Sequence, residues 1–301
     1  MNAPRRPPSR RIDGVLLLDK PTGLSSNTAL QKVRRLFNAA KAGHTGTLDP
    51  LATGLLPLCL GEATKFAGEL LDANKSYRAT LKLGVTTDSA DAEGRILQTR
   101  PVDVDESALK AALVRFHGEI SQIPPMHSAL KREGKPLYEY ARQGIELERK
   151  PRKISIFMLN LVTFGGDSAV IDVDCSKGTY IRVLAEDIGE SLGCGAHLAA
   201  LRRTRVAELD LADALTLDQL EAMSVDERDA KLAPADALLA GLTKIALDEN
   251  ETACILHGQA VRRAGSGGDR HRIYSNEGRF IGLGELSAEG WLQPRRLIAD
   301  G

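Results

Sequence analysis

The chain has 301 residues, with 40 acidic side chains balanced by 40 lysines and arginines. This length predicts one large domain and one small one, with enough apolar residues for a sizeable core. No apolar run is long enough to cross a membrane, and the four well-separated cysteines disfavour both a disulfide framework and a zinc ribbon. We therefore expect a cytoplasmic protein without a membrane segment.

The zero net charge conceals an uneven distribution of charge along the chain. Residues 131–153 carry eight basic and four acidic side chains, whereas residues 206–240 carry two basic and nine acidic ones. A neutral molecule can therefore have separate positive and negative faces. Any single arginine cluster can be ordinary solvated surface, but several together favour contact with phosphates. These clusters are Arg5, Arg6, Arg10 and Arg11, then Arg202, Arg203 and Arg205, then Arg262, Arg263, Arg270 and Arg272.

The first third of the chain begins with a tail, a strand and a helix. Residues 1–11 are basic and rich in proline, which predicts a disordered tail that lacks the apolar core of a signal peptide. Residues 15–18 form a continuous apolar run, typical of a strand buried on both faces. Ser25, Ser26 and Asn27 offer an N-cap for the helix that follows, whose apolar face is Leu30, Val33 and Phe37.

Strands and helices then interleave without a strict repeat. Residues 77–83 and 171–175 alternate between apolar and polar side chains, as half-buried strands do. Asp105 can cap a helix that stops near Gly118, and a second helical stripe ends at Gly193. This order predicts an α+β (mixed α/β) fold, with a mixed, mainly antiparallel sheet and flanking helices.

The pattern changes from about residue 246. One short helix is predicted over Glu249–His257, and short alternating segments then flank a turn at Asn276–Gly278. Short strands joined by a tight turn favour a small β-barrel.

The most informative segment is the turn-rich run GHTGTLDPLATG at residues 43–54. Its glycines allow backbone angles that other residues avoid, and Pro50 disfavours a helical conformation at Asp49. This loop is therefore shaped, and it holds one acidic side chain in a defined place. A simpler interpretation makes Asp49 an Asx-turn or a helix N-cap before Leu51.

Five motifs in order along the chain carry a family resemblance. The run 43–54 continues into LLPLCLGEATKF and is preceded by GVLLLDKPTGLSSN. The later motifs are KSYRA, PPMHSALK with LYEYARQG, and CSKGTYIR followed by GCGAHL. Together these motifs resemble the TruB family of bacterial tRNA pseudouridine-55 synthases, over about residues 12–205. His127 departs from the family, which usually has Tyr or Phe there, and the departure affects a local packing or RNA contact.

The resemblance implies a domain organisation. Residues 12–240 would form the pseudouridine synthase catalytic domain, with an RNA-binding insertion at about residues 124–153. By position and by its final PRRL, the segment 246–301 resembles a PUA-type RNA-binding domain, although more weakly than the catalytic motifs resemble theirs. The implied partner is the T stem-loop of tRNA, bound by a monomer.

The resemblance also implies the chemistry. Conversion of uridine to pseudouridine breaks the C1′–N1 bond and joins C1′ to C5, which requires no cofactor and no metal. Asp49 would supply the anion, either to attack C1′ or to remove the C2′ proton. Arg182 would keep that carboxylate charged and fork to it, and Tyr77 would stack on the extruded base. Arg182 could instead be an ordinary surface arginine, and Tyr77 a core aromatic.

Further site residues follow from the matched motifs. Those expected to line the substrate pocket are His44, Lys20, Pro21, Leu201 and Tyr180. Those expected to contact RNA from the basic insertion are Arg149, Lys150, Arg152 and Lys153.

Four other functions fit the sequence less well. The six histidines lack the close spacing of a metal hydrolase site, and no Gly-Lys-Ser/Thr follows Gly43 as a P-loop requires. A non-catalytic RNA-binding or tRNA-folding protein on the same scaffold would have no need to keep Asp49, Tyr77 and Arg182 together. A pseudouridine synthase for another RNA is the remaining alternative.

Overall fold

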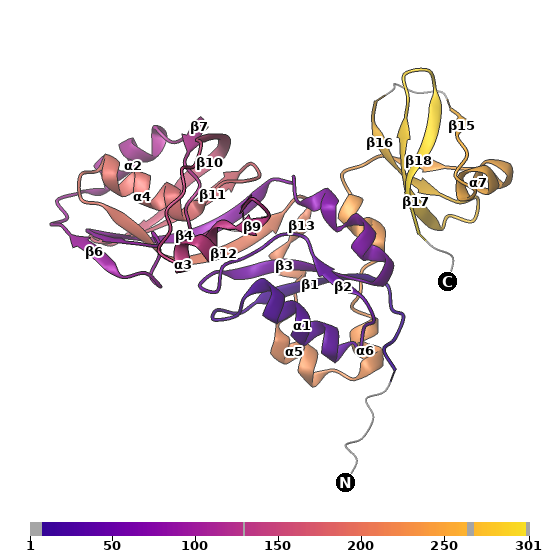
Figure 1. The fold of residues 1–301 in the computed structure, drawn as a ribbon, viewed down its shortest axis with the longest axis horizontal. Helices are drawn as coiled ribbons and strands as arrows, with labels where there is room; N and C mark the ends of the chain where they lie inside the picture. The colour runs from indigo at the N-terminus through magenta and orange to yellow at the C-terminus, as the bar shows by residue number, and fades with distance from the viewer. Residues whose placement is uncertain (1–7, 129, 264–267, 299–301) are drawn as a thin grey trace, which may run out of the picture.

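The computed structural model describes residues 8–128, 130–263 and 268–298. Figure 1 shows an elongated domain built on one long sheet, followed by a small C-terminal domain of strands and one helix. The large sheet has the strand order β1-β3-β12-β4-β11-β10-β7, and β2 and β13 pair beside this path. Its strands are β1 (Gly14–Lys20), β2 (Ala42–His44), β3 (Thr53–Leu60), β4 (Lys75–Leu83), β7 (Gly118–Gln122), β10 (Arg152–Phe164), β11 (Ser168–Cys175), β12 (Ala196–Val206) and β13 (Leu209–Asp210).

The pairing of this sheet confirms the predicted fold class. β3 and β12 run parallel, and the other neighbours along the path pair antiparallel. The sheet is therefore mixed and mainly antiparallel. Two short ribbons stand outside it, one of β5 (Val85–Thr87) with β6 (Ile96–Thr99), the other of β8 (Lys131–Arg132) with β9 (Lys135–Pro136).

β1 is buried on both faces, as its apolar run predicts. Leu16 and Leu18 enter a core with α1 (Ser26–Leu36) and α5 (Leu217–Ala222), whereas Val15 enters a core with the 3-10 helices η1 (Gly61–Leu70) and η3 (Ala235–Leu239). The Ser25 hydroxyl accepts from the Thr28 amide and caps α1, as expected from the sequence. The strand therefore joins two packed layers.

The other half of the sheet packs around β4 and β11. Their alternate apolar side chains share a core with α2 (Glu106–Val114) and α4 (Ile181–Ser191). Asp105 caps α2 as predicted. The helix ends at Val114 and not near Gly118, because Gly118 begins β7.

The start of the described chain differs from the predicted tail. Residues 1–7, with Arg5 and Arg6, lie outside the described residues. The Arg10 amide donates to the Asn38 carbonyl at 2.7 Å, and its guanidinium forms an ion pair with Asp229. Residues 8–11 therefore lie against the domain, because their backbone and charge both find partners there.

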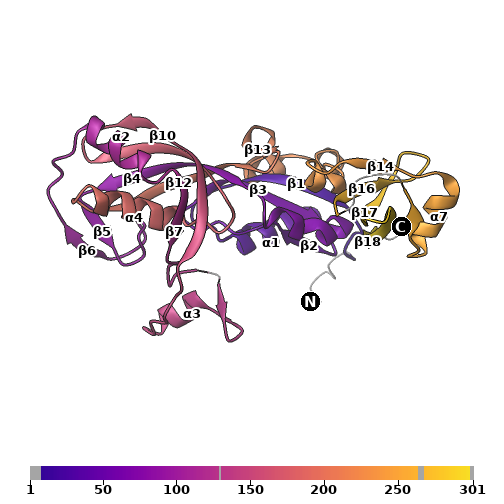
Figure 2. The same cartoon turned by 90° about the horizontal axis from the view of Figure 1, so that it is seen from above.

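The basic insertion projects from the domain. Figure 2 shows α3 (Leu137–Arg142) standing away from the sheet, with the β8–β9 ribbon beside it. The projection is shorter than predicted, because Arg152 and Lys153 already belong to β10 and pair with Gln122 and Ser121 of β7. These two residues are strand residues of the large sheet.

The C-terminal domain is a curled sheet in the order β14-β16-β17-β18-β15. Phe280 packs on Phe66 of η1 at a centroid distance of 5.4 Å, and Lys65 Nζ donates to the Leu297 carbonyl at 2.9 Å. Apolar and polar contacts therefore join the two domains. The elements are β14 (Lys244–Ala246), α7 (Glu249–Leu256), β15 (Val261–Arg262), β16 (Arg270–Tyr274), β17 (Phe280–Leu286) and β18 (Trp291–Leu297), preceded by η2 (Leu211–Asp213) and α6 (Val225–Asp229).

Within the described ranges, no helix has both the length and the apolar composition that a membrane crossing requires.

Gly54 offers a test of the sheet geometry. Its φ is +97°, and a Cβ there would lie 2.3 Å from the Arg203 carbonyl oxygen, whereas Gly23, at +79°, has open space around it. We expect Gly23→Ala to cost about 1 kcal/mol from backbone strain and Gly54→Ala more than about 3 kcal/mol, because a backbone clash is added. Urea unfolding at equilibrium measures both, and equal costs would contradict the close approach of β3 and β12.

Candidate active site

Asp49 lies in the loop between β2 and β3. Gly46 and Gly54 bound this loop with positive φ values of +130° and +97°, and the Gly23 amide donates to the Pro50 carbonyl at 2.8 Å. No helix begins after Asp49, since the next described element is β3 from Thr53, so the helix N-cap interpretation is wrong. The Asp49 side chain is 49% exposed. Its carboxylate is therefore held in a shaped loop and open to solvent.

Arg182 joins the Asp49 loop to the opposite side of the site. This residue is near the start of α4 and only 6% exposed, so it is not a surface arginine. Its Nη2 lies 3.1 Å from Asp49 Oδ2, and its Nη1 lies 3.4 Å from Asp91 Oδ2. The guanidinium is shared between two carboxylates and does not fork to Asp49 alone. Nη2 also donates to the His127 carbonyl at 2.7 Å, and Nη1 to that of Ser89 at 3.3 Å.

Opposing effects act on the Asp49 carboxyl. Burial raises the pKa of this carboxyl above its ordinary value, and the Arg182 charge opposes that shift without cancelling it. Asp91 raises the Asp49 pKa, whereas Lys20 and His127 lower it. The Arg182 guanidinium is therefore the main influence that opposes protonation of this carboxylate.

Asp91 is a site residue that the sequence analysis missed. It is 3% exposed, and its carboxylate accepts from the Ser89 hydroxyl and from the Glu93 amide, the latter at 3.1 Å. A bridge to Leu198 of β12 fixes its position. The only sequence signal is an acidic, turn-forming segment, DSADAEG, which surface loops share.

Tyr77 and Leu201 lie on neighbouring strands, β4 and β12. Tyr77 is the cross-strand partner of Arg203, and Leu201 is the partner of Ala79. Both side chains are partly buried. They pack against two cores, the one that contains α2 and α4 and the one that contains α1 and α5. Burial raises the pKa of the Tyr77 phenol, and the Arg203 charge opposes this shift. Tyr77 therefore stays a neutral phenol.

Lys20 and His44 lie next to the Asp49 loop. Lys20 bonds to its Pro50 carbonyl, and His44 is the last residue of β2 before the loop. Lys20 is fully buried, and its Nζ donates to the carbonyls of Pro21 at 2.9 Å, Leu24 at 2.7 Å and Pro50 at 3.5 Å. Burial lowers the Lys20 pKa to about 8, and Asp49 opposes this shift. Burial also lowers the pKa of His44, whose Nδ1 has no hydrogen-bond partner within the described part of the chain. Pro21 takes part through its carbonyl, and its side chain is exposed.

Tyr180 is the residue just before α4, two positions before Arg182. Its amide donates to Gln122 Oε1 at 3.0 Å, and Gln122 Nε2 donates back to its carbonyl at 3.3 Å. Burial raises the pKa of the Tyr180 phenol, and Ser128 opposes this shift. Gln122 is itself buried, so this exchange ties the start of α4 to β7.

The arginines and lysines predicted to bind phosphate differ in their surroundings, since some are paired within the chain, some are exposed and one is buried. Arg149 bonds within its own segment, to Leu147, Pro124 and Glu146, and Lys153 pairs with Glu119 at 2.7 Å. Lys150 and Arg152 are exposed. The arginines of β12 also separate, since Arg202 pairs with Asp19 and Arg205 with Asp174, while Arg203 is buried. They do not form one phosphate-binding cluster.

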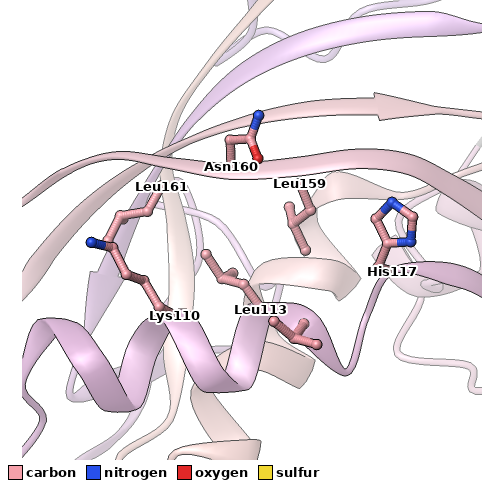
Figure 3. A pocket seen from close by; sticks show the side chains of 7 residues that line it. Lys110, Leu113, His117, Leu159, Asn160 and Leu161 are labelled. Carbon is pink, nitrogen blue, oxygen red and sulfur yellow. The ribbon is translucent and has the colours of Figure 1, made fainter.

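A concave surface of about 750 Å³ lies elsewhere, between α2 and β10. Figure 3 shows Leu113 of α2 and Leu159 of β10 among the side chains that line it, together with Lys110, His117 and Asn160. None of the predicted site residues lines it. Its position is therefore separate from the Asp49 loop.

Known proteins match the chain over most of its length. A profile described as TruB family pseudouridylate synthase, N-terminal domain, matches residues 34–181. Two C-terminal profiles follow: tRNA pseudouridylate synthase B C-terminal domain at residues 182–240, and Pseudouridine synthase II TruB, C-terminal, at 243–298.

Two similar curated proteins are named tRNA pseudouridine synthase B. The one from Dechloromonas aromatica is 57% identical over 289 residues, which covers 96% of each chain. The one from Burkholderia mallei is 56% identical over 299 residues, which covers 97% of this chain and 99% of that protein. Among solved structures, a chain of a Cbf5-Nop10-Gar1 complex has a TM-score of 0.71 at 26% identity, over 96% of this chain and 84% of that one.

Because the Arg182 guanidinium is shared between Asp49 and Asp91, removing Arg182 and removing the Asp91 charge should shift the Asp49 pKa in opposite directions. We expect Arg182→Gln to raise the pKa of Asp49, because the main stabilising charge is lost, and Asp91→Asn to lower it, because a repelling charge is lost. Carboxyl ¹³C NMR titration measures both, with Asp49→Asn to assign the signal. Asp172→Asn, which removes an exposed partner of Arg78, is the control. A shift of the same sign in the two test variants would contradict the arrangement.

Proposed function

The chain belongs to the TruB family of pseudouridylate synthases, and on this premise we propose that its Asp49, Tyr77 and Arg182 isomerise uridine-55 in the T loop of tRNA. It is an isomerase that forms pseudouridine in tRNA. The observation that carries the residue assignment is the Asp49–Arg182 ion pair, in which the carboxylate is half exposed and the guanidinium is buried. A charged carboxylate that the substrate can reach is what this reaction needs.

The reaction requires an anion beside C1′. The C1′–N1 bond breaks, a C1′–C5 bond forms, and the proton lost from C5 is balanced by the one gained at N1. Asp49 either attacks C1′ or removes the C2′ proton, and both paths need its ionised form. Arg182 supports that form through charge at 3.1 Å and fixes the carboxylate through the shared guanidinium.

The base must leave its stack before C1′ can be reached. Tyr77 and Leu201, on neighbouring strands, offer an aromatic ring and an aliphatic side chain between which a freed uracil can turn. Stacking on an aromatic ring contributes about 1 to 3 kcal/mol per base at such sites. In this proposal Tyr180, Lys20, Pro21 and His44 shape the rest of the pocket, with Lys20 holding the Pro50 carbonyl next to Asp49.

The wider RNA contact is assigned to two parts of the chain. The projecting insertion carries the exposed basic residues Lys131, Arg132, Lys135 and Arg142, and the curled sheet of residues 246–301 serves as a PUA-like RNA-binding domain. We further propose that the protein acts as a monomer in the cytoplasm, with Asp49 and Arg182 supplied by the same chain.

The function is tested with an unmodified tRNA transcript. We expect wild-type protein to place pseudouridine at position 55, and Asp49→Asn to lose turnover by at least about 10³-fold with tRNA affinity within a few-fold, because the amide keeps the shape and loses the charge. Position-resolved mapping of pseudouridine measures the product. Modification at another position would overturn the substrate assignment, and an active Asn variant would overturn the role of Asp49.

The insertion generates a separate prediction about salt dependence. Neutralising its four outer charges should weaken tRNA binding for every sequence and flatten the plot of log affinity against log salt, because fewer counterions are released. These charges are Lys131, Arg132, Lys135 and Arg142. Single-turnover rates at saturating tRNA should change much less.

The matched control is the set of charges at the base of the insertion, Arg149, Lys150, Arg152 and Lys153. Because Arg149 and Lys153 already pair with glutamates, we expect their neutralisation to reduce the salt slope by less than the outer set does. The reverse order of the two slopes would contradict the assignment of RNA contact to the projecting part.

A further inference from the structure

Arg203 is a buried arginine in the middle of the large sheet. It is 2% exposed, and within the described residues it forms no ion pair with a carboxylate. A guanidinium taken out of water is costly unless other groups satisfy it, and a neutral side chain of similar shape would fold at lower cost. The charge at this position therefore calls for a role beyond packing.

The hydrogen bonds of Arg203 reach both ends of the Asp49 loop. Its Nε donates to the Leu55 carbonyl at 2.7 Å, and its Nη1 donates to the Thr47 carbonyl at 3.3 Å. Thr47 lies two residues before Asp49, and Leu55 lies at the start of β3. One planar guanidinium thus joins the loop just before Asp49 to the strand that follows it, and we call this contact the clamp.

The backbone of Arg203 is fixed between the two strands that carry the site. It is the parallel partner of Gly54 on β3 and the antiparallel partner of Tyr77 on β4. At Gly54 the strands approach so closely that a Cβ would lie 2.8 Å from the Arg203 amide nitrogen. The clamp therefore has a rigid base, which stands directly beside Tyr77.

We propose that Arg203 is a positioning residue for the isomerisation, which sets the place of the Asp49 carboxylate relative to the Tyr77 ring. This inference rests on the proposed function. Asp49 comes from the loop that leads into β3, and Tyr77 comes from β4. β12 lies between β3 and β4, and Arg203 is its side chain that bonds to the Asp49 loop. Loss of the clamp leaves the substrate contacts in place and misaligns the carboxylate, so the effect falls on the chemical step.

The electrostatic surroundings agree with this place in the site. Nη2 of Arg203 is buried and has no partner in the described part of the chain, although an arginine has five N–H donors. The Arg203 charge also lowers the pKa values of Tyr77, His44 and Lys20. The guanidinium thus faces the groups of the site.

The activity test compares Arg203→Gln and Arg203→Lys with a control, Arg78→Gln. Arg78 is next to Tyr77 on β4 and pairs with Asp172 on the exposed side, so the control removes the same charge from the same sheet. We expect both Arg203 variants to lower the single-turnover rate at least tenfold with KM for tRNA within threefold, since a lysine cannot fork to two carbonyls. A rate within threefold of the control would overturn the proposal.

A second measurement needs no RNA and separates the clamp from the proposed function. Hydrogen exchange at the amides of Leu48 and Ala52, which bond to Ser26 Oγ and the Asp49 carbonyl, reports the order of the loop. NMR titration of His44, assigned with His44→Gln, reports the Arg203 charge.

In folded Arg203→Gln we expect faster exchange at both amides and a raised His44 pKa, with neither change in Arg78→Gln. Arg203→Lys retains the charge, so it should show faster amide exchange without a change in the His44 pKa. This variant also tests the clamp if Arg203→Gln fails to fold. Unchanged exchange in a folded variant would overturn the clamp. If wild-type protein forms no pseudouridine in tRNA, the proposed function fails, and the exchange data still decide whether Arg203 clamps the loop.

Discussion

The arrangement of the site depends on one buried guanidinium, that of Arg182. It bonds to the carboxylates of Asp49 and Asp91 and to two backbone carbonyls, so its donors are distributed over three loops. The Arg182 charge opposes the rise that burial causes in the Asp49 pKa. The buried Asp91 carboxylate pairs with Nη1 of Arg182 and orients the guanidinium. Charge, position and accessibility of Asp49 thus follow from the same contact.

Other buried or half-buried cations of the molecule bond to backbone carbonyls. Lys20 holds three carbonyls around the Asp49 loop, and Lys75 holds those of Leu70, Leu71 and Ala73 at the end of η1, with a pKa that burial lowers to about 8. Arg203 does the same for Thr47 and Leu55. Loop carbonyls cannot all be paired by regular structure, and a cation can satisfy several at once. The loops of the site are ordered in this way without further helices.

Charge segregation along the chain has an internal use as well as an external one. The acidic segment 206–240 receives basic side chains from distant parts, since Asp229 pairs with Arg10 and Asp236 lies 3.6 Å from Arg272. These arginines are therefore occupied within the molecule. The projecting insertion keeps its outer charges away from that segment, which separates the positive surface from the negative one in a chain of zero net charge.

The sequence by itself determined the local features of this protein. A continuous apolar run predicted β1, alternation predicted β4, and capping predicted α1 and α2. The shaped loop predicted that Asp49 is held in place. All of these features depend on residues a few positions apart. Motif resemblance supplied Arg182 and Tyr77. Only the tertiary structure decided that Asp91 shares Arg182, that Arg203 is buried and not a phosphate contact, and that Arg152 and Lys153 belong to a strand. Strand order and loop closure set those pairings, and no local period encodes which distant segments meet.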